Sequence, residues 1–398
     1  MTISSMSIIE HVLLFLLLFI VYAFWGKNNA NKSGVAFWQA AIIPILLFVF
    51  ITGSRYGWGN DYLWYRLQFE DVEFIRDQIV FKWLNQFLNF IGLNYVGGFM
   101  VYAFIFITCA FVFLRSYGES SMYMYCFLVP AILVSSTSTI RQGVGLAFIF
   151  LALEFFNQRK WLLMAFVTLI AFQIHSATIL TLLPMLGIFF FLKKPIYLWF
   201  SIPLYLFFTF VFDTEKIGFM ADILGQIELG NTKFQNYVDR SDRWFGAEAA
   251  NESYEQGTFA LIIMSLFNIS LFYLGYLALK VRENKQVLFI YNSVVLGATM
   301  MRAVFFYEIL RRIARPLEMF YFVPLGYVIY VYFRDCKQPK THYAILLRKY
   351  FPAGITVILA YLLMYWGRFV FFNPDADFFW YHLHEHLDPR ILPQWWHL

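Results

Sequence analysis

Charged residues are scarce in this chain. Asp, Glu, Lys and Arg make up 14% of its 398 residues, and 61% are hydrophobic, whereas soluble domains carry about 25% charged and about 45–50% apolar residues. There are three cysteines, two of them inside apolar runs, so neither a disulfide framework nor a cysteine metal site is indicated. No Walker loop or GxGxxG motif occurs, so ATP hydrolysis is unsupported. The composition favours an integral membrane protein.

Apolar runs of the length needed to cross a bilayer, about 17–25 residues, recur throughout the chain. They lie at 8–25, 35–52, 96–115, 121–137, 141–157, 160–174, 177–192, 196–212, 257–280, 286–304, 316–333 and 350–372. Because backbone groups in lipid must be satisfied internally, and no barrel-like alternation occurs, these runs predict helices. We predict an all-α protein, a polytopic membrane helix bundle of about 12 transmembrane helices, forming one domain over 1–398. The first run lacks the features of a signal peptide and is predicted to be retained.

Lys and Arg concentrate in alternate connections, which indicates the side of the membrane that faces the cytoplasm. These basic connections lie at 26–32, 115–120, 157–160, 193–194, 280–285 and 334–349. The segment 53–95, a larger loop at 213–256 and both termini are then predicted to face the outer side. Within the first of these, residues 78–94 have the apolar spacing of an interfacial amphipathic helix.

The tract GSRYGWGNDYLWY, residues 53–65, combines glycines with polar and aromatic side chains directly after the second apolar run. Its glycines let backbone N–H groups face a ligand, and Arg55 and Asp61 in such a turn can line one pocket. The alternative is an interfacial belt, in which Tyr and Trp are common and the charges are solvated.

Arg141 and Gln142 begin another apolar run, and His175 ends the next one on the same predicted side. A helix N-terminus favours anions, and arginine adds a bidentate fork for phosphate. A histidine, with a reference pKa of about 6.5, can act as base or donor. The alternatives are an arginine that reaches lipid headgroups and a histidine that joins two helices through hydrogen bonds.

The segment MRAVFFYEILRRIARP places Arg302, Arg311, Arg312 and Arg315 on the predicted outer side. This contradicts the usual preference of basic loops for the cytoplasm, so a functional requirement is indicated. The alternatives are headgroup contact or a different topology after residue 286. The histidines of the C-terminal tail have no complete metal-ligand pattern and are read as part of a polar tail.

Three segments resemble the EpsG/Wzy-type polysaccharide polymerase family: the tract 53–65, the run STIRQGVGLAFIFLALEFFNQRKWLLMAFVTLIAFQIHSATIL, and the arginine-rich stretch 302–316. The resemblance implies a helical membrane glycosyltransferase related to lipid-sugar-dependent transferases of the bacterial inner membrane. Such proteins join undecaprenyl-diphosphate-linked oligosaccharide repeat units at the periplasmic face and make O-antigen, capsule or exopolysaccharide.

On this interpretation the arginines stabilise charge on the departing diphosphate, and Asp61 or His175 accepts the proton of the acceptor hydroxyl. The predicted catalytic residues are Asp61, His175, Arg141 and Arg312. The predicted substrate-binding residues are Arg55, Tyr56, Trp58, Tyr62, Tyr65, Gln142, Arg302, Arg311 and Arg315. No metal, other cofactor or nucleic acid is expected. The expected partners are the lipid-linked oligosaccharide, membrane lipids and, as a further candidate, a chain-length regulator protein.

Two alternatives remain at this stage. A ligase or single-sugar transferase that uses the same lipid carrier would need the same kind of site. A flippase for lipid-linked sugars would be a transporter, for which charges near mid-membrane and an internal repeat are expected; no strong repeat is visible in this sequence.

Overall fold

The computed structural model describes residues 5–54, 61–75, 78–137, 139–212, 257–305 and 307–371. Within these ranges every regular element is a helix, which confirms the all-α class. Each of the twelve predicted apolar runs contains a helix. Six helical stretches are long and apolar enough to cross a membrane: Gly34–Gly53, Tyr95–Arg115, Ile140–Asn157, Thr258–Val281, Leu310–Asp335 and His342–Tyr365. The total of about 12 membrane crossings stays a prediction.

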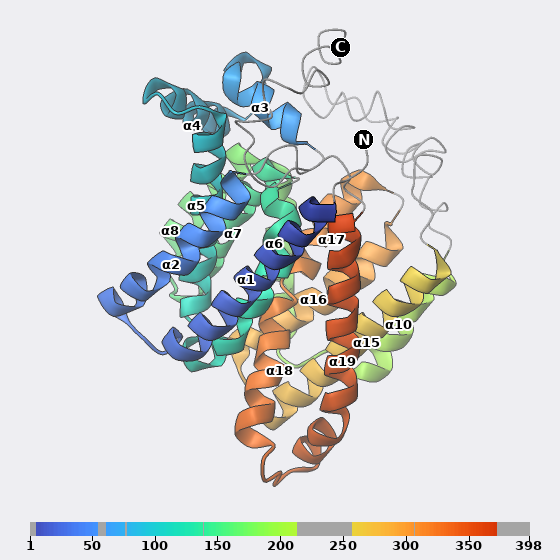
Figure 1. The fold of residues 1–398 in the computed structure, drawn as a ribbon. Helices are drawn as coiled ribbons and strands as arrows, with labels where there is room; N and C mark the ends of the chain where they lie inside the picture. Colours follow the sequence, from blue (N-terminus) through green and yellow to red (C-terminus); the bar gives the residue numbers. More distant parts are fainter. Residues whose placement is uncertain are drawn as a thin grey trace. The chain divides into compact units, whose positions relative to one another are not determined.

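The chain divides into two compact units, and Figure 1 labels the helices of both. Unit 1 comprises Met1–Ile179 and Leu363–Leu398, and unit 2 comprises Leu180–Leu362. The predicted loop at 213–256 lies outside the described residues. The single domain over 1–398 stays a prediction.

Unit 1 is built from long helices joined by short connections, with two short helices placed over one end. Its elements are α1 (Ser5–Asn29), α2 (Gly34–Gly53), α3 (Tyr62–Glu70), η1 (Val72–Phe74), α4 (Ile79–Phe90), α5 (Tyr95–Arg115), η2 (Gly118–Tyr123), α6 (Met124–Thr137), α7 (Ile140–Asn157), α8 (Trp161–Ile174) and the start of α9 (Ala177–Phe191).

A proline inside α2 is compensated by a side chain of α1. Pro44 has no N–H to donate to the carbonyl four residues earlier, that of Ala40. The indole Nε1 of Trp25 donates to this carbonyl at 2.8 Å, and the hydroxyl of Tyr22 donates to the carbonyl of Pro44 itself at 3.0 Å. Both bonds join α1 to α2, and the first gives the Ala40 carbonyl the donor that Pro44 lacks.

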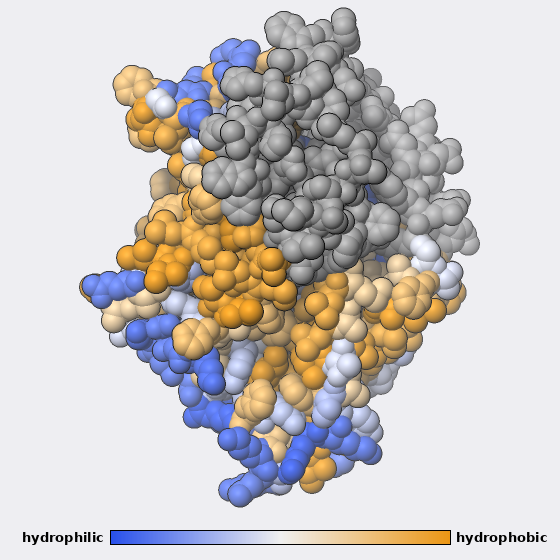
Figure 2. All heavy atoms as spheres, in the orientation of Figure 1, coloured by the Kyte–Doolittle hydropathy of each residue, from blue (hydrophilic) through white to orange (hydrophobic). Residues whose placement is uncertain are grey.

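Large apolar side chains cover the outer faces of the first two helices. Phe24 is 71% exposed and Ile43 is 72% exposed, and Figure 2 shows apolar surface over α1 and α2. Exposed apolar surface of this extent marks a contact with lipid or another protein. Together with the six long apolar helices, it indicates a membrane protein.

Unit 2 contains the rest of α9, α10 (Leu198–Phe210), α15 (Thr258–Val281), α16 (Lys285–Ala303), α17 (Glu308–Met319), α18 (Phe322–Asp335) and most of α19 (His342–Phe371). The short turn between α15 and α16 is fixed by Asn284, whose side-chain oxygen accepts from the N–H groups of Gln286 and Val287 at 3.0 and 3.1 Å. This N-cap starts α16.

The helix boundaries around the predicted run 316–333 differ from the prediction of one helix. An amphipathic helix, α17, already begins at Glu308, and α18 follows it after a two-residue turn. α17 packs closely on α16 because residue 297 is a glycine. A Cβ atom there would lie 2.5 Å from both the backbone nitrogen of Glu318 and the Cβ of Leu317.

Candidate functional site

The described site residues fall into two groups, one in each unit. In unit 1, α3 and α4 pack over the ends of α5, α7 and α8 through one buried apolar cluster. Its members are Tyr62, Tyr65, Phe69, Ile75, Phe81, Leu88, Tyr95, Val96, Phe99, Tyr102, Ile140, Val144 and Ile174. The cluster therefore brings the end of the tract 53–65 to the helix ends that carry Arg141 and His175. Arg55, Tyr56 and Trp58 lie outside the described residues.

The guanidinium group of Arg141 is held at the first turn of α7 by two side chains from the covering segment. Its Nη1 donates to Oε1 of Gln78 at 2.6 Å, and its central carbon lies 5.9 Å from the centroid of the Tyr65 ring. Gln78, the residue just before α4, is buried. Since guanidinium has five N–H donors, the bond to Gln78 leaves donors for an anion.

Tyr65 and Asp61 belong to the same polar cluster. Tyr65 is buried, and burial raises the pKa of its phenol; the positive charge of Arg141 opposes this rise and the negative charge of Asp61 adds to it. Tyr65 is therefore a neutral hydroxyl near pH 7. Asp61 is exposed at the start of α3, and its carbonyl accepts the N–H of Tyr65 at 3.0 Å. A carboxylate, a phenol and a guanidinium thus lie together.

His175 lies at the same end of α7 as Arg141. A Cβ atom built on Gly145 would lie 3.2 Å from the Cβ of His175 and 2.7 Å from Cγ2 of Thr178. Gly145 is one turn after Arg141 and therefore on the same helix face. The hydroxyl of Thr178 donates to the carbonyl of His175 at 2.7 Å, which fixes the turn between α8 and α9.

Two predicted binding residues of unit 1 are buried in its interior. The Tyr62 ring is 1% exposed and packs edge-to-face on Phe99 with centroids 5.5 Å apart. Gln142, next to Arg141, is also buried. Arg66, which sequence reasoning did not single out, lies 4.5 Å from the centroid of the Tyr95 ring.

The second group lies in unit 2, where α16 ends and α17 begins. Arg302 is 6% exposed, Arg311 and Arg312 are partly buried, and Arg315 is exposed. The guanidinium carbons of Arg302 and Arg311 lie 4.7 and 5.6 Å from the centroid of one ring, that of Phe305. Cation–π contact of this kind is favourable within about 6 Å, so Phe305 holds two cations near each other.

Arg302 interacts with a group of polar side chains that the sequence analysis does not identify. The side-chain amide of Asn268 donates to the hydroxyl of Tyr205 at 3.1 Å. Arg302 interacts electrostatically with both Tyr205 and Glu318, and Glu318 also with Arg315. The signal was present in the sequence, since Asn268 and Glu318 are polar residues inside predicted spans, where such residues are usually functional.

The described ranges contain no group of three or more His, Cys, Asp or Glu side chains that could bind a metal ion. No curated protein and no solved structure matches the chain. The family model described as EpsG family matches residues 38–379, a range that includes both groups of site residues. The predicted resemblance is confirmed: the chain belongs to the EpsG family of Wzy-type polymerase-like proteins, and its helical membrane architecture fits a polysaccharide polymerase-type role.

Proposed function

We propose that this protein is a bacterial polysaccharide polymerase of the inner membrane. It joins undecaprenyl-diphosphate-linked oligosaccharide repeat units at the periplasmic face and releases lipid diphosphate. The observation that supports this most is the fixation of arginine at helix ends: Arg141 is held by Gln78 at 2.6 Å, and Arg302 and Arg311 share the ring of Phe305. Fixed cations of this kind suit a diphosphate, and the family match supplies the reaction type.

In the proposed reaction the bond between the anomeric carbon and the diphosphate oxygen breaks, and the electron pair leaves with the lipid diphosphate. Positive charges that are already in place lower the barrier because negative charge grows on that oxygen. Arg311, Arg312 and Arg315 take this role in unit 2. Several guanidinium forks can bind two phosphates, and Arg141 is proposed as a further phosphate ligand.

The acceptor hydroxyl forms the new bond to the anomeric carbon and loses its proton to a base. Asp61 is the better candidate in unit 1, because it is exposed and lies close enough to Tyr65 and Arg141 to share their electrostatic environment. His175 is the alternative base at the same end of the unit. Tyr65, as a neutral phenol, can donate a hydrogen bond to a sugar oxygen or phosphate.

The test is reconstitution. Purified protein in proteoliposomes is supplied with lipid-linked repeat units extracted from the native host, and the products are separated on a gel. A ladder of lengths supports the polymerase. A single added unit indicates the ligase or single-sugar transferase, and movement of unchanged lipid-linked sugar across the bilayer indicates the flippase.

A further inference from the structure

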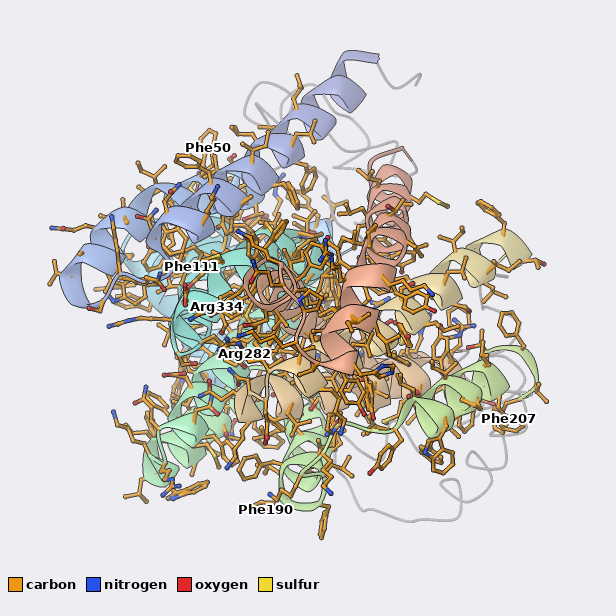
Figure 3. All side chains as sticks on the ribbon, turned by 90° about the horizontal axis from the view of Figure 1, so that it is seen from below. Phe50, Phe111, Phe190, Phe207, Arg282 and Arg334 are labelled. Carbon is orange, nitrogen blue, oxygen red and sulfur yellow. The ribbon has the colours of Figure 1, made fainter. Side chains whose placement is uncertain are left out.

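An open pocket of about 550 Å³ lies in unit 2, where α15 ends and where α18 connects to α19. Its polar lining includes Arg282, Arg334, Asp335, Lys337, Lys340 and Thr341. Four cationic side chains thus face one carboxylate. Both arginines, labelled in Figure 3, line this pocket, and Figure 2 shows hydrophilic surface over the α18–α19 connection.

This pocket is distinct from the arginine group around α17. It lies beside the start of α16, whereas Arg302 lies in the last turn of that helix. At 1.5 Å per residue, a helix of this length separates its ends by roughly 25 Å. A phosphate group in the pocket therefore does not contact Arg302, and the two sites in unit 2 are separate.

The arginines of the pocket are held in fixed positions. Arg282 forms a two-point ion pair with Asp335, with Nε–Oδ2 at 2.7 Å and Nη2–Oδ1 at 2.8 Å, so Nη1 is not part of this pair. The hydroxyl of Tyr327 donates to the carbonyl of Arg282 at 2.8 Å. Arg334 donates from Nη1 to the hydroxyl of Tyr330. Side chains that are ordered in advance lose less entropy when a ligand binds.

The connection that carries the two lysines is also ordered. Nη1 of Arg348 donates to the carbonyl of Lys337 at 3.2 Å. The hydroxyl oxygen of Thr341 accepts the N–H of Ala344 at 3.2 Å, which caps the start of α19. The side chains of Lys337 and Lys340 are exposed and line the pocket from this connection.

The partial negative charges at the ends of nearby helices explain only part of the positive charge that lines the pocket. α15 and α18 both end at the pocket, and arginines there offset the partial negative charge of the last carbonyls. Lys337 and Lys340 lie beyond those helix ends, and the first N–H groups of α19 add positive potential of their own. The concave surface therefore has more positive charge than the helix ends and Asp335 require.

We propose that this pocket binds a phosphate-bearing anion, either the headgroup of an anionic phospholipid or a soluble phosphate compound. The basic connections predict that this end of unit 2 faces the cytoplasm, whose membrane surface is rich in anionic lipid. Lysine and arginine side chains near such a surface attract anionic lipid headgroups. The site is independent of the proposed polymerase chemistry.

The test compares two double variants with the same loss of charge. K337Q/K340Q alters the pocket, and K285Q/K349Q removes two exposed lysines that do not line it. Full-length protein in detergent is mixed with phosphatidylglycerol or phosphatidylcholine, and retained lipid is counted by native mass spectrometry. A second arm adds inorganic diphosphate, both to the lipid-loaded protein and alone in a calorimeter.

The wild type and K285Q/K349Q are expected to retain phosphatidylglycerol in preference to phosphatidylcholine. K337Q/K340Q is expected to retain at least about tenfold less phosphatidylglycerol than the wild type. Diphosphate that displaces the lipid, or that binds without lipid and loses this binding in K337Q/K340Q, identifies a soluble phosphate ligand. Retained lipid that diphosphate does not displace identifies the headgroup. Equal retention and equal diphosphate binding in wild type and K337Q/K340Q, equal losses in the two double variants, or no binding of either probe would overturn the proposal.

Discussion

The side-chain oxygen of Gln78 lies 2.6 Å from Nη1 of Arg141, although 63 residues separate the two in the chain. Both residues are at helix starts, α4 and α7 respectively. The amide accepts a hydrogen bond without neutralising the guanidinium, so Arg141 is oriented and its charge stays available for the proposed anionic substrate.

Replacement of Gln78 tests whether orientation of Arg141 matters. Q78A removes the acceptor and is expected to lower kcat by up to about 100-fold, because small misplacements of a catalytic group are costly. Q78E places a carboxylate on Arg141, neutralises it and is expected to weaken substrate binding as well, which appears as a raised KM. Steady-state kinetics on lipid-linked repeat units separate the two effects. Unchanged kcat and KM in both variants would remove Gln78 and Arg141 from the proposed site.

Replacement of Arg312 tests the diphosphate role of α17. R312A is expected to reduce chain lengthening by about 10²–10³-fold, the usual cost of losing one preorganised charge donor, while membrane insertion is retained. R312K keeps the charge but loses the fork and is expected to be intermediate. K349Q, which removes one cation from an exposed position outside both groups, is the control. A normal ladder from R312A would exclude this residue from the mechanism.

The indole of Trp25 is expected to stabilise unit 1. W25F leaves the part-buried carbonyl of Ala40 without its 2.8 Å donor, and the loss of such a partner costs up to about 1–3 kcal/mol. W38F makes the same chemical change at an indole that packs on Phe37 and is the control. Thermal unfolding in detergent should show a lower Tm for W25F than for W38F; equal Tm values would mean that the bond to Ala40 does not contribute.

Gly297 is expected to tolerate no side chain. In G297A the new methyl group meets Glu318 and Leu317 of α17 at 2.5 Å, and overpacking of this kind costs about 1–3 kcal/mol. Because α17 carries the arginine group, both stability and chain lengthening should fall. G187A is the matched control, since a Cβ there meets nothing within 4 Å. A G297A protein with wild-type Tm and activity would contradict the close packing of α16 and α17.

Labelling can test the predicted side of each group. The native cysteines Cys109, Cys126 and Cys336 are buried, so background labelling should be low. With a membrane-impermeant maleimide added to intact spheroplasts, T139C and R315C are expected to react and K337C to react only after lysis. Reaction of T139C and R315C from opposite sides of the membrane would end the proposed function, while leaving the phosphate pocket to its own test.

Helix positions could be predicted because each depends on a local pattern. The twelve apolar runs all contain helices, and the spacing of residues 78–94 gave α4, with Trp83 and Phe90 exposed and Leu88 buried. Contacts between distant segments could not be predicted in this way. The Gln78–Arg141 bond depends on how α3 and α4 fold back over α7. No pattern in the sequence around either residue indicates this contact.

Two further differences have physical causes. The glycines predict a turn in the tract 53–65, yet α3 already begins at Tyr62, because the apolar cluster of unit 1 buries one face of that short helix. The charge of the segment 302–315 predicts a connection between two spans, yet α17 begins at Glu308. Its arginines are spaced so that one face packs on α16 while the other stays polar.

The ring of Phe305 contacts two guanidinium groups and brings no charge of its own. It therefore gives both arginines a favourable contact that needs no counter-ion. On the proposed function, the same two arginines must be in place again after each diphosphate departs. A contact of both guanidinium groups with one ring then keeps the pair in position between one addition and the next.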